Sequence, residues 1–167
     1  LVCNMENFGF IKVAAAVPSV RVADCRHNAD CIAELLREAC AGGVQIAVFP
    51  ELRLTAYSCG DLFQNALLLD EAERALQHLL DAGQQLDIVG IVGMPVRLHN
   101  QLFNCAVVFS RGRILGVVPK TFLPNYNEFY EKRWFASAAD ATVTEMVLCG
   151  QTVPFGAQLL FESANVT

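Results

Sequence analysis

The sequence predicts an α/β fold, and three observations support this prediction. Apolar segments suited to buried strands alternate with a segment of helical periodicity in the first half of the chain. The strand candidates at 44–50 and 86–98 are apolar without alternation, which is typical of strands covered on both faces. With 54% hydrophobic and only 17% charged residues, the 167-residue chain can bury the core of one domain.

The first strand candidate lies within 10–18 and ends at Pro18, and a helix is expected within 23–43. In that helix the apolar residues at i, i+3, i+4, i+7 and i+8 share one face. They are Ile32, Leu35, Leu36, Ala39 and Cys40. Asp24 or Asn28 can cap the start of the helix, and Gly42 or Gly43 can end it.

The second strand, 44–50, leads into a loop at 51–60, after which Asp61 is the expected cap of a mostly helical stretch to about Ala82. The third buried strand covers 86–98. The order strand, helix, strand, helix, strand is that of a layered α/β sheet.

The second half of the chain changes character. The segments 102–109 and 114–120 predict a hairpin with Gly112 in its turn, so the sheet should be mixed. The aromatic segment 121–135 has no clean period and is expected to be a loop that leads into a short helix. In the remainder, 142–167, we expect a hairpin around Cys149 to Gln151 and then one more short strand.

Composition excludes several classes of function. A net charge of −5 without a Lys/Arg block offers no surface for nucleic acid or for an anionic membrane. No apolar run is long enough to span a bilayer, and the first residues lack the features of a secretory signal, so a cytoplasmic location is expected. The seven cysteines are odd in number and form no C-x-x-C, which supports neither a disulfide framework nor a metal site.

Two ionisable residues, Glu51 and Lys120, each follow a proline at the carboxyl end of an apolar strand. Ligands of α/β sheets gather at these strand ends, so the two side chains could face one pocket. Together a glutamate and a lysine can act as a general base and as a cationic stabiliser of a developing oxyanion. Either residue taken alone is more often the first solvated residue of a loop.

Several other residues allow two interpretations. Glu128, eight positions after Lys120, is either a solvated carboxylate or an orienting partner of that lysine. The aromatic residues of 121–135 either roof the core or form a pocket wall or a contact surface. Covalent chemistry would need a thiolate, and Cys59 is the best local candidate, although a merely buried cysteine is the commoner case.

The segments "VFPEL" and "GVVPKTFLP" resemble signatures of the nitrilase, or carbon–nitrogen hydrolase, superfamily. The segments "SCGDLFQNALLLDEA", "TFLPNYNEFYEKRWF" and "VPFGAQLLF" are similar, more closely, to the glutaminase domain of glutamine-dependent NAD synthetases. The resemblance runs from about Phe10 to Phe161. It implies an α-β-β-α sandwich and amide hydrolysis by a Glu-Lys-Cys triad.

By position in these motifs, the resemblance implies that Glu51 is the general base, that Lys120 stabilises the oxyanion and that Glu128 helps to hold the lysine and the substrate. Tyr57, Tyr126 and Phe129 match positions that line a glutamine pocket. One departure from the family is Ala56, where glycine is common. Because alanine disfavours a positive φ, we expect the loop that aims Tyr57 to differ.

The family nucleophile lies after the segment that "FGAQLLFE" resembles, and this sequence ends before it. We therefore expect residues 1–167 to be the N-terminal part of the domain, with an incomplete sandwich, no activity alone and a tendency to form homo-oligomers. The parent would carry a synthetase domain that uses ATP and magnesium. The alternatives are an amidase with another amide substrate and a non-catalytic assembly module.

Overall fold

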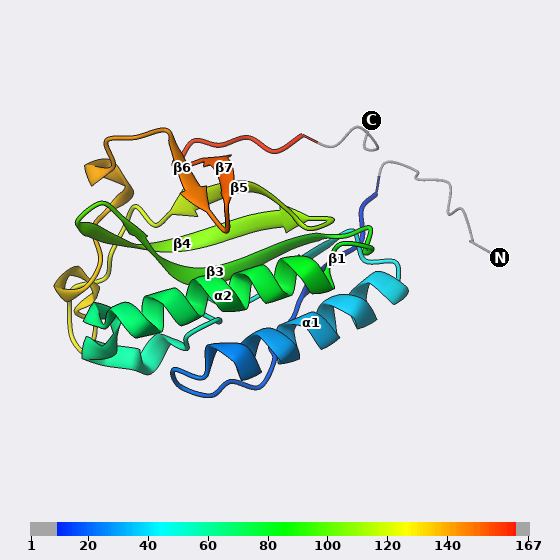
Figure 1. Cartoon of the computed structure of the whole chain (residues 1–167), viewed down its shortest axis with the longest axis horizontal. Helices are drawn as coiled ribbons and strands as arrows, with labels where there is room; N and C mark the ends of the chain where they lie inside the picture. The colour runs from blue at the N-terminus through cyan, green and yellow to red at the C-terminus, as the bar shows by residue number, and fades with distance from the viewer. Residues whose placement is uncertain (1–9, 163–167) are drawn as a thin grey trace.

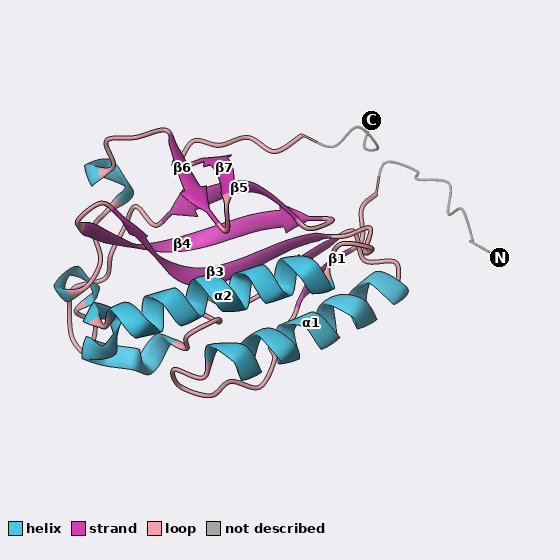
Figure 2. Cartoon of the chain, in the orientation of Figure 1, coloured by secondary structure: helices cyan, strands magenta, loops and turns pink. Residues whose placement is uncertain are grey.

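Two long helices lie against one face of a mixed sheet (Figures 1 and 2) in this computed structural model, which describes residues 10–162. The helices are α1 (Cys25–Ala41) and α2 (Ala66–Ala82). The five-stranded sheet has the order β1-β2-β3-β4-β5. Its strands are β1 (Val13–Ala15), β2 (Ile46–Val48), β3 (Val89–Leu98), β4 (Gln101–Ser110) and β5 (Arg113–Pro119).

The strand directions decide which loops meet. β1, β2 and β3 are parallel, and β4 is antiparallel to both of its neighbours, β3 and β5. β5 therefore runs in the direction of β2 and β3, and the carboxyl ends of these strands lie at one edge of the sheet. The predicted mixed α/β sheet and the hairpin around Gly112 are confirmed.

A second, two-stranded ribbon packs beside β5. It consists of β6 (Glu145–Leu148) and β7 (Gln151–Pro154), joined at Cys149 and Gly150 as predicted. The backbone N–H of Cys149 donates to Glu73 Oε1 of α2 at 2.9 Å, which ties the ribbon to the helix layer. Residues 10–162 also contain three short 3₁₀ helices, namely η1 (Tyr57–Gln64), η2 (Glu131–Arg133) and η3 (Ala138–Asp140).

The core lies between the helices and one face of the sheet. Side chains that alternate along β3 and β4, such as Val92, Met94 and Val107, join the same buried cluster as Ile32 of α1 and Leu76 of α2. Burial of these apolar side chains, at roughly 1.5–3 kcal/mol each, is the main term that stabilises the fold.

The opposite face of the sheet is apolar but open among the described residues. Val48 on β2 is 41% exposed and Val13 on β1 is 61% exposed. The strand at 44–50 was predicted to be covered on both faces. This prediction is wrong for the face opposite the helices, where Val48 is exposed. The described residues thus form one helix layer on one five-stranded sheet, with the other face of that sheet open.

Two further predictions need correction. The cap of α2 is Asn65, whose side chain accepts the Leu67 N–H at 2.9 Å, and not Asp61. Asp61 lies in η1, and its carboxylate binds Arg133 and Trp134 instead. After β7 the described residues form no further strand: an isolated bridge joins Phe155 to Val117, and 156–162 have no strand or bridge. Residues 163–167 lie outside the described residues. The cap at Asp24 is confirmed, since its Oδ1 accepts the His27 N–H.

Candidate functional site

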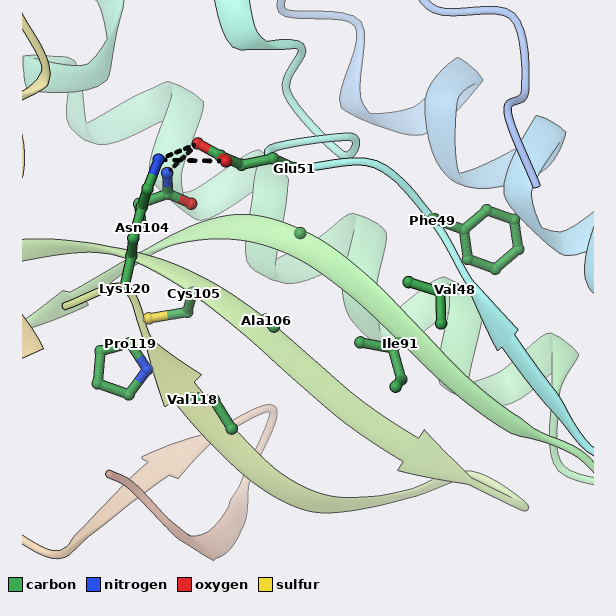
Figure 3. A pocket seen from close by; sticks show the side chains of 11 residues that line it. Val48, Phe49, Glu51, Ile91, Asn104, Cys105, Ala106, Val118, Pro119 and Lys120 are labelled. Carbon is green, nitrogen blue, oxygen red and sulfur yellow. Dashed lines mark hydrogen bonds and ion pairs between the residues drawn. The ribbon is translucent and has the colours of Figure 1, made fainter. Parts of the chain in front are cut away.

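Glu51 and Lys120 meet at the carboxyl edge of the sheet. Lys120 Nζ lies 3.0 Å from Glu51 Oε1 and 3.2 Å from Oε2. Figure 3 shows the two side chains pointing toward each other. Glu51 follows β2 and Lys120 follows β5, and these strands run in the same direction. The prediction that these two strand-end residues face one pocket is confirmed as geometry.

The chain reaches this point because β3 has no side chain at Gly93. A Cβ at this position would lie 2.4 Å from Leu52 N and 2.8 Å from Glu51 Cα. The segment after β2 can therefore cross directly over β3, and the Leu54 N–H donates to the Gly93 carbonyl at 3.2 Å. This crossing carries Glu51 over two strands toward Lys120.

A second carboxylate, Glu131, completes the ion-pair network. Its side chain in η2 is only 2% exposed, and Lys120 Nζ donates to its Oε1 and Oε2 at 3.1 and 3.0 Å. Tyr57 Oη donates to Glu131 Oε1 at 2.7 Å. A buried carboxylate requires such partners, because an unpaired charge in the interior is very unfavourable. One ammonium group is thus shared by two carboxylates.

The network sets the charge states of its members. Partial burial alone would lower the pKa of Lys120, but the hydrogen bonds to Glu51 and Glu131 outweigh it and raise that pKa. The pKa of Tyr57 is raised by burial, by its hydrogen bond to Glu131 and by the nearby carboxylate charges. At neutral pH the site therefore presents an ammonium cation and a neutral phenol that donates a hydrogen bond.

The remaining predicted site residues lie farther along the aromatic loop. Glu128 is exposed, and the carboxylate that contacts Lys120 is Glu131, three positions later. Tyr126 and Phe129 pack edge to face with ring centroids 6.0 Å apart. Neither ring lines the pocket around Lys120, and Tyr57 joins the site only through Glu131.

A pocket of about 350 Å³ opens beside Glu51, Asn104 and Lys120. These three polar groups stand at one end of it. The rest of its wall is apolar and consists of Val48, Phe49, Ile91, Gly93, Cys105, Ala106, Val118 and Pro119 (Figure 3). The arrangement can hold a small molecule with its reactive group against the charged end.

Among the cysteines in residues 10–162, Cys105 alone lines the pocket around Lys120, and none of these thiols is hydrogen-bonded to Glu51 or Lys120. Cys59 is buried and donates to the Thr55 carbonyl at 3.0 Å, and burial raises its pKa. Cys105 lies on β4 beside the pocket, but burial also strongly raises its pKa. Both thiols are therefore protonated at neutral pH. Cys3 lies outside the described residues.

Within residues 10–162, no three His, Cys, Asp or Glu side chains gather as metal ligands. No helix in the same range is long and apolar enough to cross a membrane.

Residues 12–162 match the carbon–nitrogen hydrolase family. The chain belongs to this family. Its sequence is 37% identical over 163 residues to the glutamine-dependent NAD(+) synthetase of Mycobacterium leprae, which covers 98% of this chain and 24% of that protein. It is 31% identical to the enzyme of the same name from Rattus norvegicus, covering 87% of this chain and 21% of that protein. The chain thus spans about a quarter of the length of the curated relatives it matches.

Solved structures agree with this placement. A glutamine-dependent NAD(+) synthetase from Cytophaga hutchinsonii has a TM-score of 0.83 at 27% identity, covering 92% of this chain and 26% of that one. An amidase from Nesterenkonia sp. has a TM-score of 0.64 at 21% identity, covering 86% and 54%, and this likeness concerns the fold alone. The fold is that of the nitrilase superfamily.

Sequence reasoning missed two residues of this carbon–nitrogen hydrolase site, Glu131 and Asn104. Glu131 lies in an aromatic segment without periodicity, so no pattern distinguished it from Glu128. Asn104 could have been identified from the sequence, because an amide in the middle of an apolar strand must find a hydrogen-bond partner. Asn104 is 3% exposed and donates to Glu51 Oε1.

Asp61 ties η1 to the segment that carries Glu131. Its carboxylate accepts two bonds from Arg133 and one from Trp134 Nε1. These hydrogen bonds lower the pKa of Asp61 to about 2. A lowered pKa in the folded state stabilises the protein above the ordinary pKa of 3.8, and this contribution is lost as the pH falls toward 2.

We therefore expect Asp61→Asn to lower stability clearly at pH 6 and much less at pH 2. Denaturant unfolding of the variant and of the wild type at both pH values measures this. An equal difference between the two proteins at pH 2 and pH 6 would show that the charge of Asp61 is not what matters.

Ala56, before Tyr57, adopts φ +76° and ψ 154°. The sequence led us to expect that an alanine would avoid a positive φ, yet the loop has one. This region of backbone space is essentially restricted to glycine and costs other residues about 1–3 kcal/mol.

Ala56→Gly is expected to raise the free energy of unfolding by about 1 kcal/mol, since the relief of strain exceeds the added entropy of the unfolded chain. Chemical denaturation measures the change. Ala141→Gly is the matched control. Because Ala141 has an ordinary φ of −73°, this substitution should lower the free energy of unfolding. The same sign of change at both positions would contradict the strain at Ala56.

Proposed function

We propose that this chain contributes the base and the oxyanion-stabilising lysine of a glutaminase, whose ammonia is used to amidate nicotinic acid adenine dinucleotide to NAD. The observation that carries the proposal is the contact of Lys120 with both oxygens of Glu51 in a carbon–nitrogen hydrolase fold. Relatives named glutamine-dependent NAD(+) synthetases support glutamine as the substrate.

In the proposed first half-reaction, Glu51 takes the proton of a cysteine thiol as the sulfur bonds to the side-chain amide carbon of glutamine. The carbonyl electron pair moves to oxygen, and the Lys120 ammonium stabilises that oxyanion. When the intermediate collapses, the C–N bond breaks and Glu51 returns the proton to nitrogen. Ammonia leaves, and a thioester remains.

In the second half-reaction, Glu51 accepts a proton from water as the water oxygen attacks the thioester carbon. The C–S bond then breaks, the sulfur regains a proton, and glutamate is released. Of the described cysteines, we assign none as the nucleophile: Cys59 is buried with its thiol directed to the Thr55 carbonyl, Cys105 is buried in β4, and neither is hydrogen-bonded to Glu51. We therefore propose that this chain is inactive alone and that the thiol comes from sequence beyond it.

The supporting roles follow from the contacts. We assign to Glu131, in place of Glu128, the role of holding Lys120, because Glu131 makes the ion pair. Tyr57 holds Glu131, and it can still border the substrate since it is 40% exposed. Tyr126 and Phe129 are proposed to wall the glutamine pocket from the adjacent loop.

The cofactors, the oligomeric state and the location of the complete protein are part of the same proposal. We propose that ATP and magnesium act in a synthetase domain of the complete protein, as relatives named NAD(+) synthetases are about four times the length of this chain. Homo-oligomers would cover part of the open sheet face around Val48, and the protein is expected in the cytoplasm.

The test is ammonia release from glutamine by the complete gene product that contains this chain, beside residues 1–167 alone. Activity of the complete protein that is lost in Glu51→Gln and in Lys120→Ala supports the proposal. Faster turnover of simple aliphatic amides than of glutamine would favour an amidase instead. Absence of amide hydrolysis in the folded complete protein would refute the proposal.

A further inference from the structure

Asn104 is an isolated amide within the apolar strand β4. Its neighbours Phe103 and Cys105 are buried in the core, whereas Asn104 faces the side of the sheet where Glu51 crosses. Its side chain is 3% exposed, so it cannot be solvated by bulk water. A buried amide without partners would cost about 1–3 kcal/mol, and its contacts therefore matter.

Those contacts join the two charged residues of the site. Asn104 Nδ2 donates to Glu51 Oε1 at 2.6 Å, and the backbone N–H of Lys120 donates to the Asn104 carbonyl at 2.8 Å. Because a carboxylate only accepts hydrogen bonds, the NH₂ group of the amide must face Glu51. Asn104 thus holds the glutamate through its side chain and the start of the lysine segment through its backbone.

The two oxygens of Glu51 are consequently not equivalent. Oε1 accepts from Asn104 at 2.6 Å and from Lys120 at 3.0 Å, whereas Oε2 accepts only from Lys120, at the longer distance of 3.2 Å. Oxygen lone pairs engaged by two donors are less available to a proton. Oε2 keeps the greater capacity to accept one.

We propose that Asn104 is a positioning residue that binds Oε1 of Glu51 and thereby leaves Oε2 as the oxygen that exchanges protons with the nucleophile and the leaving group. This inference rests on the proposed role of Glu51 as a base. In this proposal Asn104 acts through the orientation of Glu51, to which its side chain donates.

The test compares Asn104→Leu, which keeps the side-chain size but removes the donor, with Asn104→Asp, which replaces the donor by an anion. Gln101→Leu is the matched control, since Gln101 is an exposed amide on the same strand. Variants are compared after circular dichroism has established that they are folded. Two measurements follow, one on turnover and one on the orientation of Glu51.

In the complete gene product, both Asn104 variants are expected to lower kcat for glutamine by about 10- to 100-fold while KM changes less than twofold. The control should retain kcat. A merely structural role would lower the amount of folded enzyme or move kcat and KM together. An unchanged kcat in folded Asn104→Leu, with an active wild type, overturns the inference but leaves the proposed function intact.

The second measurement does not depend on activity. In residues 1–167, the side-chain NH₂ resonances of Asn104 should shift in Glu51→Gln, and the ¹³Cδ resonance of Glu51 should shift in Asn104→Leu but not in Gln101→Leu. If the complete wild type hydrolyses no amide, the proposed function fails. In that case the two resonances alone test the inference. Shifts of both resonances support the orientation of Glu51 by Asn104, and the absence of both shifts overturns it.

Discussion

Lys120→Met is expected to lower the free energy of unfolding by about 3 kcal/mol at neutral pH. The substitution leaves Glu131 2% exposed and without its ammonium partner, and the removal of one member of a buried pair is among the costliest changes a side chain can undergo. Since Lys120 is itself 27% exposed, we take the lower end of the usual range. Denaturant unfolding monitored by circular dichroism measures the loss.

The stability difference between wild type and Lys120→Met should depend on pH. The pKa of Lys120 is raised above its ordinary value of 10.5 in the folded protein, so its stabilising contribution is complete below pH 10.5 and is lost as the pH rises through the folded pKa. The gap between wild type and variant should therefore be constant from pH 7 to 9 and close at higher pH. Lys132→Met, at an exposed neighbour of Glu131, should show no such gap.

Glu131→Gln in the Lys120→Met background should restore part of the loss, because it removes the unpaired charge and keeps the shape. Additive losses in the double variant would mean that the two residues do not interact, contrary to the network described here.

Gly93→Ala is expected to cost about 3 kcal/mol and to displace Glu51 from Lys120. The new Cβ would meet backbone atoms, Leu52 N at 2.4 Å and Glu51 Cα at 2.8 Å, which cannot move aside as a flexible side chain can. Unfolding measurements give the stability, and the ¹⁵Nζ resonance of Lys120 reports the lost contact with Glu51.

Gly156→Ala is the control for this substitution. A Cβ at Gly156 meets nothing within 4 Å, and the backbone there is ordinary, so stability should change little. Equal stability of the two variants would mean that the segment after β2 does not depend on the bare backbone of β3.

The sequence predicted the parts of the site that follow from strand direction. Glu51 and Lys120 were identified because each ends an apolar strand, and a mixed sheet with β2 and β5 in the same direction brings such ends to one edge. Asp24 could be named as a cap for the same kind of reason, since capping is a local interaction.

The parts that sequence reasoning missed depend on loops. Whether Glu128 or Glu131 reaches Lys120 is decided by the turn at Tyr126 and the 3₁₀ turn at η2, and the segment 121–135 has no periodicity from which either could be inferred. Asp61 looked like a helix cap because nothing in the sequence indicates its partners Arg133 and Trp134, more than 70 positions away.

The contacts of Lys120 with Asn104 and with Glu51 differ in the sequence separation that they span. Asn104 lies on β4 and Lys120 directly follows β5, and these strands form a hairpin around Gly112. Glu51 and Lys120, in contrast, are separated by 69 positions. Closing the longer span costs more chain entropy, and contacts of this kind form later in folding. We expect the lysine half of the site to assemble first, with the β4–β5 hairpin, and the glutamate to be placed last, when β2 pairs with β3. The base is then absent from any partly folded chain, and the complete charged network is a property of the native state alone.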